Sequence, residues 1–438
     1  MTDILLTILG TTVFIPFLVT LFRTQWDRRR WSRQLALLLF LLHGVTLLYI
    51  PSVMYISAGL LLAGLLLYIF HMRPCFRLTS FMVVALIYTA WFAVTLLWSP
   101  MPRKGAQFLV DNGLPLLGMA LVGSSTLQVN KEEYTKGIRV LCYTALVFLG
   151  MSVLTWLVSC VQLQMWPWNW PFMHKGVLGG EEPFKWVYRW LGGLEGYSHP
   201  SYNLLPLFAV TSMAMWLRKQ DTLKATGWWG LLSGTLLLTL ITQSRMGIIF
   251  CVLELIAYII YMQSSLRHQL TTAAMIAVFA ISVIGSTWSF WTNLGEDTNR
   301  RLLTEYTWRY IQAKPWTGAG AGALNPIEIC HTIGEDYWPH VGYISPDANP
   351  THWWLKSCML PHNEWMADWA HGGVVAALCV LGLYFCLLIR CARKKRFAET
   401  VFLLILILFS LVEPALYIGK GLYLFGYLAG LLYSKEWL

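Results

Sequence analysis

The sequence VMYISAGLLLAGLLLYIFH, at residues 53–71, contains no Asp, Glu, Lys or Arg and is followed by the basic joint MRPCFR at residues 72–77. An apolar run of this length suits a helix that crosses the roughly 30 Å hydrocarbon layer of a bilayer. Basic residues gather on the cytoplasmic side of such helices, so this joint is expected to face the cytoplasm. The stretch therefore indicates a membrane-spanning helix, and the rest of the chain repeats its pattern.

The composition supports the same fold class along all 438 residues. Apolar residues make up 57% of the chain and charged residues 12%, whereas soluble domains average roughly 45–50% and about 25%. This balance excludes a disordered chain and argues against a soluble enzyme. We expect an all-α polytopic membrane protein of about twelve or thirteen transmembrane helices, with a large, partly helical periplasmic loop between late spans. The expected spans lie near residues 4–22, 35–50, 53–71, 79–98, 107–123, 138–161, 200–217, 228–243, 247–262, 270–291, 373–390, 399–418 and 421–434.

The formal charge of +10 is spread over the joints rather than gathered in one patch. Most of the 32 Lys and Arg residues occupy every second joint. This distribution argues against a nucleic-acid surface and assigns those joints to the cytoplasm, so that the N-terminus is expected outside. Residues 4–22 have no basic residue before them and no small-residue cleavage site after them, so we interpret them as a membrane span rather than a secretory signal.

Two joints on the outer side are much longer than the others, at residues 162–199 and 292–372. Long connections often carry function. The first is rich in tryptophan, and an aromatic belt at the lipid headgroups is favoured there over platforms for sugar rings. The expected organisation is transmembrane helices at 1–291, the large periplasmic loop with the catalytic residues at 292–372, and C-terminal transmembrane helices at 373–438.

The strongest local feature is the sequence Pro361-His362-Asn363-Glu364-Trp365. Pro361 suits the first turn of a helix, which would place His362 in that turn. The positive end of a helix dipole disfavours a cation, so the imidazole is expected to be neutral and able to accept a proton, beside N–H groups that attract an anion. The alternative is a histidine that caps the helix and bonds water at the interface, and the local pattern does not separate the two.

Arg245 lies in the sequence Ser244-Arg245-Met246-Gly247, at the expected outer end between two spans. Positive-inside statistics do not favour a cation there, and a guanidinium binds phosphate through paired N–H donors. We therefore favour a site for a phosphate-bearing lipid. The alternative is an arginine that extends to the interface or pairs with a carboxylate such as Glu254 or Asp111.

The large loop contains three early arginines, Arg300, Arg301 and Arg309. On a helix, Arg301, Glu305 and Arg309 share one face at a spacing of four residues, which is typical either of a salt-bridged exposed face or of a second anion clamp. The stretch KPWTGAGAG at residues 314–322 follows. It has no βαβ context, so a flexible turn is favoured over a nucleotide-binding loop.

Cysteine and histidine spacings do not indicate a metal site. The nine cysteines include no Cys-x-x-Cys pair, and the histidines of the large loop are too irregularly spaced to predict zinc ligands. Cys330 and Cys358 share that loop, and whether they form a disulfide is left open.

Three segments, taken in order, resemble the O-antigen ligase family of membrane glycosyltransferases, which is related to O-antigen polymerases and protein O-oligosaccharyltransferases. The family pattern has a Ser-Arg pair at the outer end of a middle span, an Arg-containing helix before a Pro and Gly-x-Gly run, and a His-Asn pair before a glycine-rich helix start. The matching residues are Ser244-Arg245, then Arg309, Pro315, Gly318 and Gly320, and then His362-Asn363 with Gly372-Gly373.

The resemblance covers about residues 195–390. One departure is Ala376, where the family pattern has a second glycine, and this loosens the match to the last motif. In the N-terminal half, Trp98-Ser99-Pro100 with Arg103-Lys104 also fits the family, as does the segment at 195–203 around His199.

The resemblance implies an enzyme that moves a glycan from an undecaprenyl-pyrophosphate donor to a sugar hydroxyl of a lipid A-core acceptor. It implies a multi-pass protein of the bacterial inner membrane, surrounded by membrane lipids, with its active site facing the periplasm. His362 would be the general base, and Arg245 and Arg309 would bind the pyrophosphate and stabilise its departing charge. The implied substrate-binding residues are Arg301, Arg103, Lys104, Asn363 and His199. Since pyrophosphate is a good leaving group, no metal or cofactor is expected, and a single displacement would invert the anomeric centre.

Related activities share this chemistry. A polymerase would use another lipid-linked glycan as acceptor, and a protein O-oligosaccharyltransferase would use a serine or threonine hydroxyl. The ligase is preferred because the chain is compact and shows no long C-terminal soluble region. A lipid-linked-glycan transporter is the alternative from another class, and its sites would lie near the bilayer midplane, where Glu254 and Asp111 are the candidates.

Overall fold

The structure, a computed structural model, describes most of the chain: residues 11–48, 51–125, 127–162, 200–241, 244–263, 295–334, 361–417 and 419–434, with isolated residues between 265 and 278. Within these residues the regular structure is helical, which confirms the all-α prediction for this part of the chain. Several predictions fall outside the described residues: nearly all of the tryptophan-rich loop with His199, most of the span near 270–291, and the pairing of Cys330 with Cys358.

Long apolar helices identify a membrane protein. Four described helices have the length and composition to cross a bilayer: Val53–Met72, Pro102–Ser124, Lys131–Leu154 and Glu364–Arg393. Shorter apolar helices occupy Thr12–Arg23, Ser80–Thr95, Met246–Met262, Phe397–Ser410 and Gly421–Ser434. Each overlaps a predicted span, because in hydrocarbon a helix satisfies its own backbone hydrogen bonds while its apolar side chains face lipid or other helices.

The described elements follow the chain in this order: η1 (Thr12–Phe14), α2 (Ile15–Arg23), α3 (Trp31–Thr46), α4 (Pro51–Met72), α5 (Ser80–Thr95), α6 (Pro102–Phe108), η2 (Leu109–Gly113), α7 (Leu114–Ser124), α8 (Lys131–Gln162), α10 (Pro200–Lys219), α11 (Ala225–Ile241), α12 (Arg245–Met262), α15 (Gly295–Ala313), α16 (Pro326–Ile333), α18 (Glu364–Arg393), α19 (Phe397–Ser410), η6 (Ala415–Tyr417) and α20 (Gly419–Ser434).

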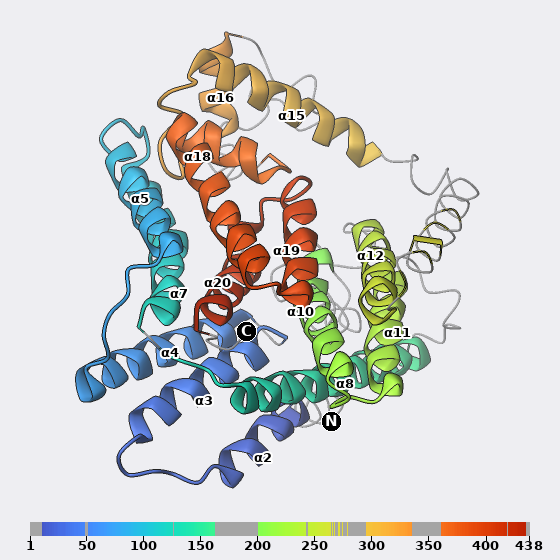
Figure 1. Ribbon diagram of the computed structural model, residues 1–438. Helices are drawn as coiled ribbons and strands as arrows, with labels where there is room; N and C mark the ends of the chain where they lie inside the picture. The colour runs from blue at the N-terminus through green and yellow to red at the C-terminus, as the bar shows by residue number, and fades with distance from the viewer. Residues whose placement is uncertain are drawn as a thin grey trace.

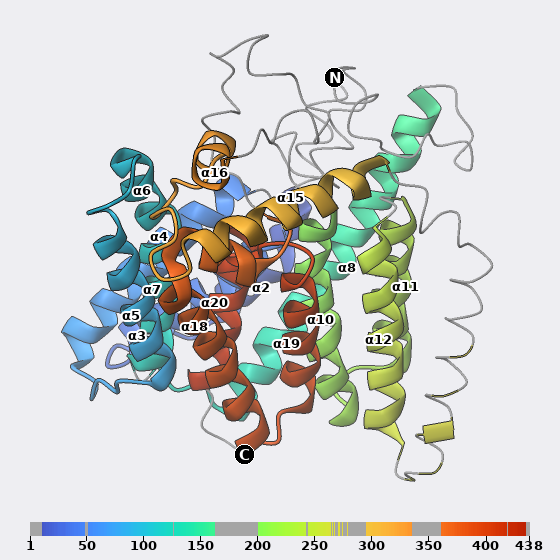
Figure 2. The ribbon, with the colours of Figure 1, turned by 90° about the horizontal axis from the view of Figure 1, so that it is seen from above.

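The helix α15 lies across the ends of the membrane helices. Figure 1 shows it passing over the ends of α18, α19 and α12, and in the view from above it crosses in front of them (Figure 2). It packs on α18 and α16. In Figure 1 the N-terminal helices α2, α3 and α4 lie at the opposite side of the molecule from α15. The start of α18 is therefore covered by α15 at one end of the bundle.

The helix α18 consists of two helical segments joined at Gly373, whose φ of 69° and ψ of −170° lie outside the helical region. A Cβ atom at Gly373 would collide with the backbone of Trp316, so this close approach requires glycine. Beyond the break, the Val374 N–H donates to the Pro315 carbonyl over 3.0 Å. The break separates a short outer segment from the long apolar one, and the chain at 315–316 fills the gap.

Candidate active site

The start of α18 differs from the sequence prediction. The helix begins at Glu364, and Asn363 is its N-cap, with an extended backbone and a side-chain Oδ1 that accepts from the Met366 N–H over 3.1 Å. His362 therefore precedes the cap, and the prediction that it lies in the first turn is wrong. The reason is that an asparagine side chain replaces a missing backbone hydrogen bond at the helix start, which decides the boundary more strongly than Pro361 does.

His362 is paired with a buried carboxylate. Nδ1 of His362 lies 2.9 Å from Oε2 of Glu413, and the side chains are 30% and 7% exposed respectively. When Glu413 is ionised, its carboxylate only accepts hydrogen bonds, and in that state Nδ1 is the donor. The neutral ring then has its acceptor lone pair on Nε2. A carboxylate that fixes the tautomer of a histidine in this way is the arrangement of a general base.

Glu413 was not predicted as a site residue, because the expected span at 399–418 placed it inside a membrane helix. The helix α19 ends at Ser410 instead, and the Glu413 N–H donates back to the Phe409 carbonyl over 2.8 Å in the turn that closes it. Pro414 disfavours helical geometry at the preceding residue and has no N–H to continue the helix. An acidic residue directly before a proline, near the end of an apolar block, was the available signal.

Polar contacts hold residues 411–417 against the start of α18. Asn363 Nδ2 donates to the Leu411 carbonyl over 3.0 Å. The Leu416 N–H donates over 2.8 Å to Oε2 of Glu364, a side chain that is fully buried. Because these contacts lie on both sides of residue 413, they fix its carboxylate next to the imidazole.

The glycine-rich residues 314–322 form the predicted turn, and residues 318–322 within it are buried. Gly318 and Gly320 have φ of 61° and 92°, in the region that favours glycine. The Ala319 N–H donates to the Ala370 carbonyl over 2.8 Å, and a Cβ atom at Gly318 would lie only 2.7 Å from the same oxygen. The glycines allow this backbone to lie directly against the outer segment of α18 and support it.

Arg309 lies on α15 and is paired along the face that the sequence spacing predicts. Its Nη2 donates to Oε1 of Glu305 over 2.9 Å, and its guanidinium lies 5.5 Å from the centroid of the Tyr306 ring. The salt-bridged face is thus one of the two arrangements that the sequence left open. The side chain of Arg301 lies outside the described residues.

Ring and ion contacts hold α15 over α18. Trp308 meets Trp369 of α18 edge to face, with ring centroids 6.0 Å apart. On the α16 side, Tyr310 donates to Oε1 of Glu328 over 3.0 Å, and Lys314 lies 2.6 Å from the same oxygen. Burial, and then the nearby Glu328 carboxylate, raise the pKa of Tyr310 above its ordinary value, so its hydroxyl remains a donor.

Arg245 is the first residue of α12, and Ser244 is the N-cap, with Oγ accepting from the Gly247 N–H over 3.2 Å. This start lies at the end of α12 toward which α15 extends (Figure 1). The side chain of Arg245 lies outside the described residues. Glu254, one of its two candidate partners, is buried and accepts from Oγ of Ser212 over 2.8 Å.

Residues 230–381 match the family model described as O-antigen ligase. The match supports the resemblance to the O-antigen ligase family that the motifs indicate. The matched range contains the start of α12, all of α15, the glycine-rich turn and the outer segment of α18. The match identifies a glycosyltransferase-like membrane enzyme. No curated protein matches the chain.

Three candidate site residues lie outside the matched range. Glu413 lies beyond it, and Arg103 and Lys104 lie before it, on α6. The helix α6 packs against the glycine-rich turn, since a Cβ atom at Gly322 would lie 2.9 Å from the Lys104 carbonyl oxygen. The fold therefore brings the predicted basic pair beside the turn that supports α18.

One further histidine of the O-antigen ligase domain, His371, is fully buried in α18, and its Nδ1 lies 2.8 Å from the Ala367 carbonyl oxygen. This contact makes it part of the packing around the break in the helix. Among the residues that the structure describes, no group of three His, Cys, Asp or Glu side chains is placed to hold a metal ion.

Proposed function

We propose that this protein is an O-antigen ligase that transfers a glycan from undecaprenyl pyrophosphate to a sugar hydroxyl of lipid A-core, at the periplasmic face of the bacterial inner membrane. The family match supports a glycosyltransferase-like enzyme. The pairing of His362 with Glu413 carries the proposal, because it provides a proton acceptor held by a buried carboxylate at the end of a membrane helix.

In the proposed reaction, Nε2 of His362 takes the proton of the acceptor hydroxyl as the hydroxyl oxygen attacks the anomeric carbon of the donor. The bond between this carbon and the pyrophosphate oxygen breaks, and the pyrophosphate leaves with the electron pair. Attack from the opposite face inverts the anomeric configuration. Glu413 stabilises the imidazolium that forms and keeps Nε2 directed at the acceptor.

Arginines supply the positive charge for the pyrophosphate in this proposal. Arg245 and Arg309 bind the pyrophosphate and stabilise the negative charge that develops on it. Further positive charge around the pyrophosphate comes from Arg301, Arg103 and Lys104. Glu305 is displaced from Arg309 at low cost, because an ion pair whose side chains are 42% and 49% exposed is worth about 0–1 kcal/mol.

The two remaining predicted residues, Asn363 and His199, have different roles in this proposal. Asn363 uses Oδ1 to cap α18 and Nδ2 to hold the Leu411 carbonyl, so we assign it to positioning His362 rather than to contact with the glycan. His199, before α10, is assigned to substrate binding on the family resemblance alone.

The cell-based test replaces His362 by Ala, confirms that the protein is made, and analyses lipopolysaccharide on a gel. A ligase loses all long-chain material and accumulates polymerised carrier-linked glycan. Accumulation of single repeat units indicates a polymerase, and intact lipopolysaccharide with unglycosylated protein indicates a protein O-oligosaccharyltransferase. The matched control is His331→Ala, an exposed histidine on α16 of the same loop, which is expected to leave lipopolysaccharide unchanged. Normal lipopolysaccharide from the His362 variant overturns the mechanism.

Two measurements on purified protein complete the test. Glycan transfer is measured with the protein in detergent solution, where no membrane separates two compartments. An enzyme still transfers the glycan there, whereas a transporter of lipid-linked glycan does not. The anomeric configuration of the product tests the single displacement, and a product that retains the donor's configuration would refute it.

A further inference from the structure

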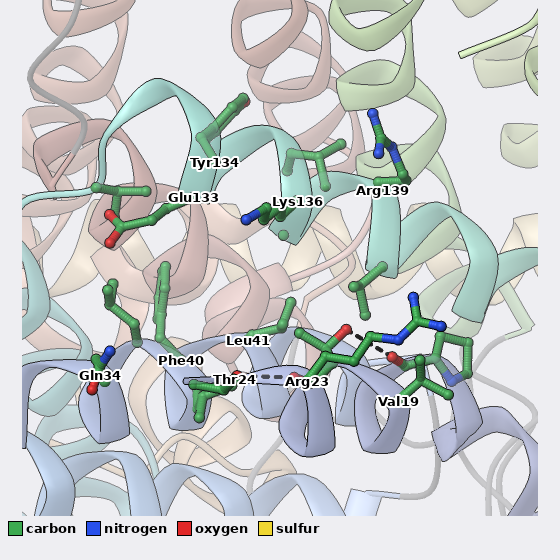
Figure 3. Close-up of a pocket in the computed structure, with 18 of the residues that line it drawn as sticks. Val19, Arg23, Thr24, Gln34, Phe40, Leu41, Glu133, Tyr134, Lys136 and Arg139 are labelled. Atoms are coloured by element: carbon green, nitrogen blue, oxygen red, sulfur yellow. Dashed lines mark hydrogen bonds between the residues drawn. The ribbon is translucent and has the colours of Figure 1, made fainter. Parts of the chain in front are cut away.

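A groove of about 950 Å³ lies between α2, α3, α8 and the end of α20, away from the candidate active site. Figure 3 shows α8, with Lys136 and Arg139, on one side of it and α2, with Val19 and Arg23, on the other. A cavity of this size is typical of sites that hold a ligand rather than a few waters.

The groove lies at the far end of the membrane helices from His362. The Val129 N–H in its wall donates to the Ser434 carbonyl at the end of α20 over 2.9 Å. In turn, Nε of Arg390, near the end of α18, donates to the Leu432 carbonyl over 3.3 Å. The Val129 end of the groove therefore lies near the opposite end of α18 from His362. The basic joints at this end place it on the cytoplasmic side by the positive-inside rule.

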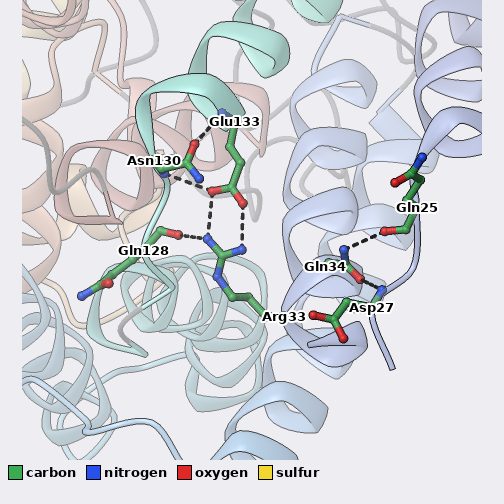
Figure 4. A network of polar contacts seen from close by, with 7 residues as sticks. All are labelled: Gln25, Asp27, Arg33, Gln34, Gln128, Asn130 and Glu133. Atoms are coloured by element: carbon green, nitrogen blue, oxygen red, sulfur yellow. Dashed lines mark hydrogen bonds and ion pairs between the residues drawn. The ribbon is translucent and has the colours of Figure 1, made fainter. Parts of the chain in front are cut away.

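The walls of the groove are preformed by two polar links. Arg33 Nη1 and Nη2 donate to the two carboxylate oxygens of Glu133 over 2.7 and 2.8 Å, which ties α3 to α8 (Figure 4). The side chain of Gln34 accepts from the Asp27 N–H and donates to the Gln25 carbonyl, each over 2.9 Å, which ties the turn between α2 and α3 (Figure 4). The groove thus does not depend on a ligand to hold its helices apart.

Within the described part of the chain, the groove has more basic side chains than acidic partners for them. The Glu133 carboxylate is used by Arg33, and Lys136 is paired with Glu132 at 2.7 Å. Arg23 and Arg139 also line the groove, and no described residue forms an ion pair or hydrogen bond with either side chain. Nε of Arg139 is buried without a hydrogen-bond partner among the described residues. A buried N–H donor of a cationic side chain costs free energy when it has no acceptor, so an anion bound here would be stabilising.

The groove also has apolar walls that continue to the exposed face of α2. Its walls include Leu37 and Leu41 from α3 and Val19 from α2. Ile15 and Val19 are 51% and 43% exposed, so the apolar face of α2 continues from the groove to the lipid-facing surface. A soluble phosphate would leave these walls in water, whereas a lipid would cover them with its acyl chains.

We propose that this groove binds an anionic phospholipid of the cytoplasmic leaflet, with the phosphate at Arg23 and Arg139 and an acyl chain along α2 and α3. Basic pockets between helices on this side of a membrane suit anionic headgroups, and a guanidinium suits phosphate oxygens. The site is separate from the proposed glycan transfer, so the two proposals stand or fall independently.

The test titrates phosphatidylglycerol into the purified full-length protein in detergent and counts bound lipid by native mass spectrometry. We expect one preferred lipid, and about fivefold weaker binding for each of Arg23→Gln and Arg139→Gln, since one basic residue near an anionic lipid is worth about 1 kcal/mol. The matched control is Arg28→Gln, an exposed arginine in the joint between α2 and α3 that does not line the groove. It should bind as tightly as the unaltered protein.

A conservative variant separates loss of charge from loss of fold. Arg139→Lys keeps the cation and is expected to recover most of the binding, while the thermal unfolding temperatures of both Arg139 variants are compared. The proposal is overturned if both glutamine variants bind phosphatidylglycerol as tightly as the unaltered protein does. It is also overturned if phosphatidylethanolamine, which has no net charge, binds as tightly as phosphatidylglycerol, or if inorganic phosphate competes fully. Preferential binding of a polyprenyl diphosphate over phosphatidylglycerol also overturns it.

Discussion

Replacing Glu413 by Gln tests whether the carboxylate takes part in catalysis. Glutamine keeps the size of the side chain and an oxygen that accepts from Nδ1 of His362, but it removes the negative charge. That charge matters only after His362 has taken a proton, because only the imidazolium is attracted to it. The variant is therefore expected to fold and to bind substrates, but to react slowly.

The expected magnitude follows from the contact. Unit charges separated by 2.9 Å attract by about 6 kcal/mol at an effective dielectric constant near 20. His362 is 30% exposed and both charges are spread over several atoms. About half of this attraction, or about 3 kcal/mol, should act on the transition state, and this corresponds to about a hundredfold in rate.

The assay measures transfer from a purified carrier-linked glycan to a lipid A-core acceptor under saturating conditions. The expected result is a fall of about a hundredfold in kcat with little change in KM. The matched control is Glu399→Gln, a buried carboxylate at the start of α19, the helix that precedes Glu413; it accepts from Tyr134. Its kcat should stay within a fewfold of the unaltered protein.

A second pair of measurements separates a base from a structural histidine. Added imidazole should partly restore the activity of His362→Gly, because it enters the vacated space, but should not restore Glu413→Gln. If Glu413→Gln retains more than half of the kcat, the carboxylate does not stabilise the imidazolium, and the reasoning from the 2.9 Å contact is refuted.

Three further substitutions test the fold around the site. Gly373→Ala should destabilise the protein by at least about 1–3 kcal/mol in thermal or denaturant unfolding, because it strains a φ of 69°, whereas Gly59→Ala, with open space around its Cβ position, should not. Asn363→Ala should cost about 0.5–2 kcal/mol and also lower kcat, since the cap and the link to the Leu411 carbonyl are both lost; unchanged kcat would remove its positioning role. Tyr310→Phe should cost about 0.5–1.5 kcal/mol through loss of the hydrogen bond to Glu328 while leaving kcat unchanged, and equal stability would show that this bond contributes nothing.

The helices were predictable where apolar residues run continuously. Residues 53–71 fall within the helix Pro51–Met72, and the predicted span at 247–262 falls within Arg245–Met262. The predicted helix boundaries were wrong where a single side chain or turn decides the boundary. The Asn363 cap moved the start of α18 past His362, and the chain turned at Pro414 before the predicted end of the span at 399–418. Hydropathy averages over many residues and does not detect such local hydrogen bonds.

The candidate site divides in the same way. The chemical types of His362, Arg245 and Arg309 and their order along the chain indicated a base and anion-binding groups. The role of the glycine-rich residues 314–322 was missed, because positive φ values there serve a close approach to α18, a helix that begins only at residue 364. A local pattern shows that a turn is present but not what it packs against.

The sequence by itself determined the membrane location and the helical class, and it suggested the residues proposed for the chemistry, because hydrophobicity and side-chain type are properties of short segments. The tertiary structure decided which side chains from distant parts of the chain lie next to one another. His362 meets Glu413 across 51 positions of sequence, and Arg23 and Arg139 line one groove from two different helices. Such pairings depend on how helices pack in three dimensions, and packing is set by many weak contacts between segments that no local pattern contains.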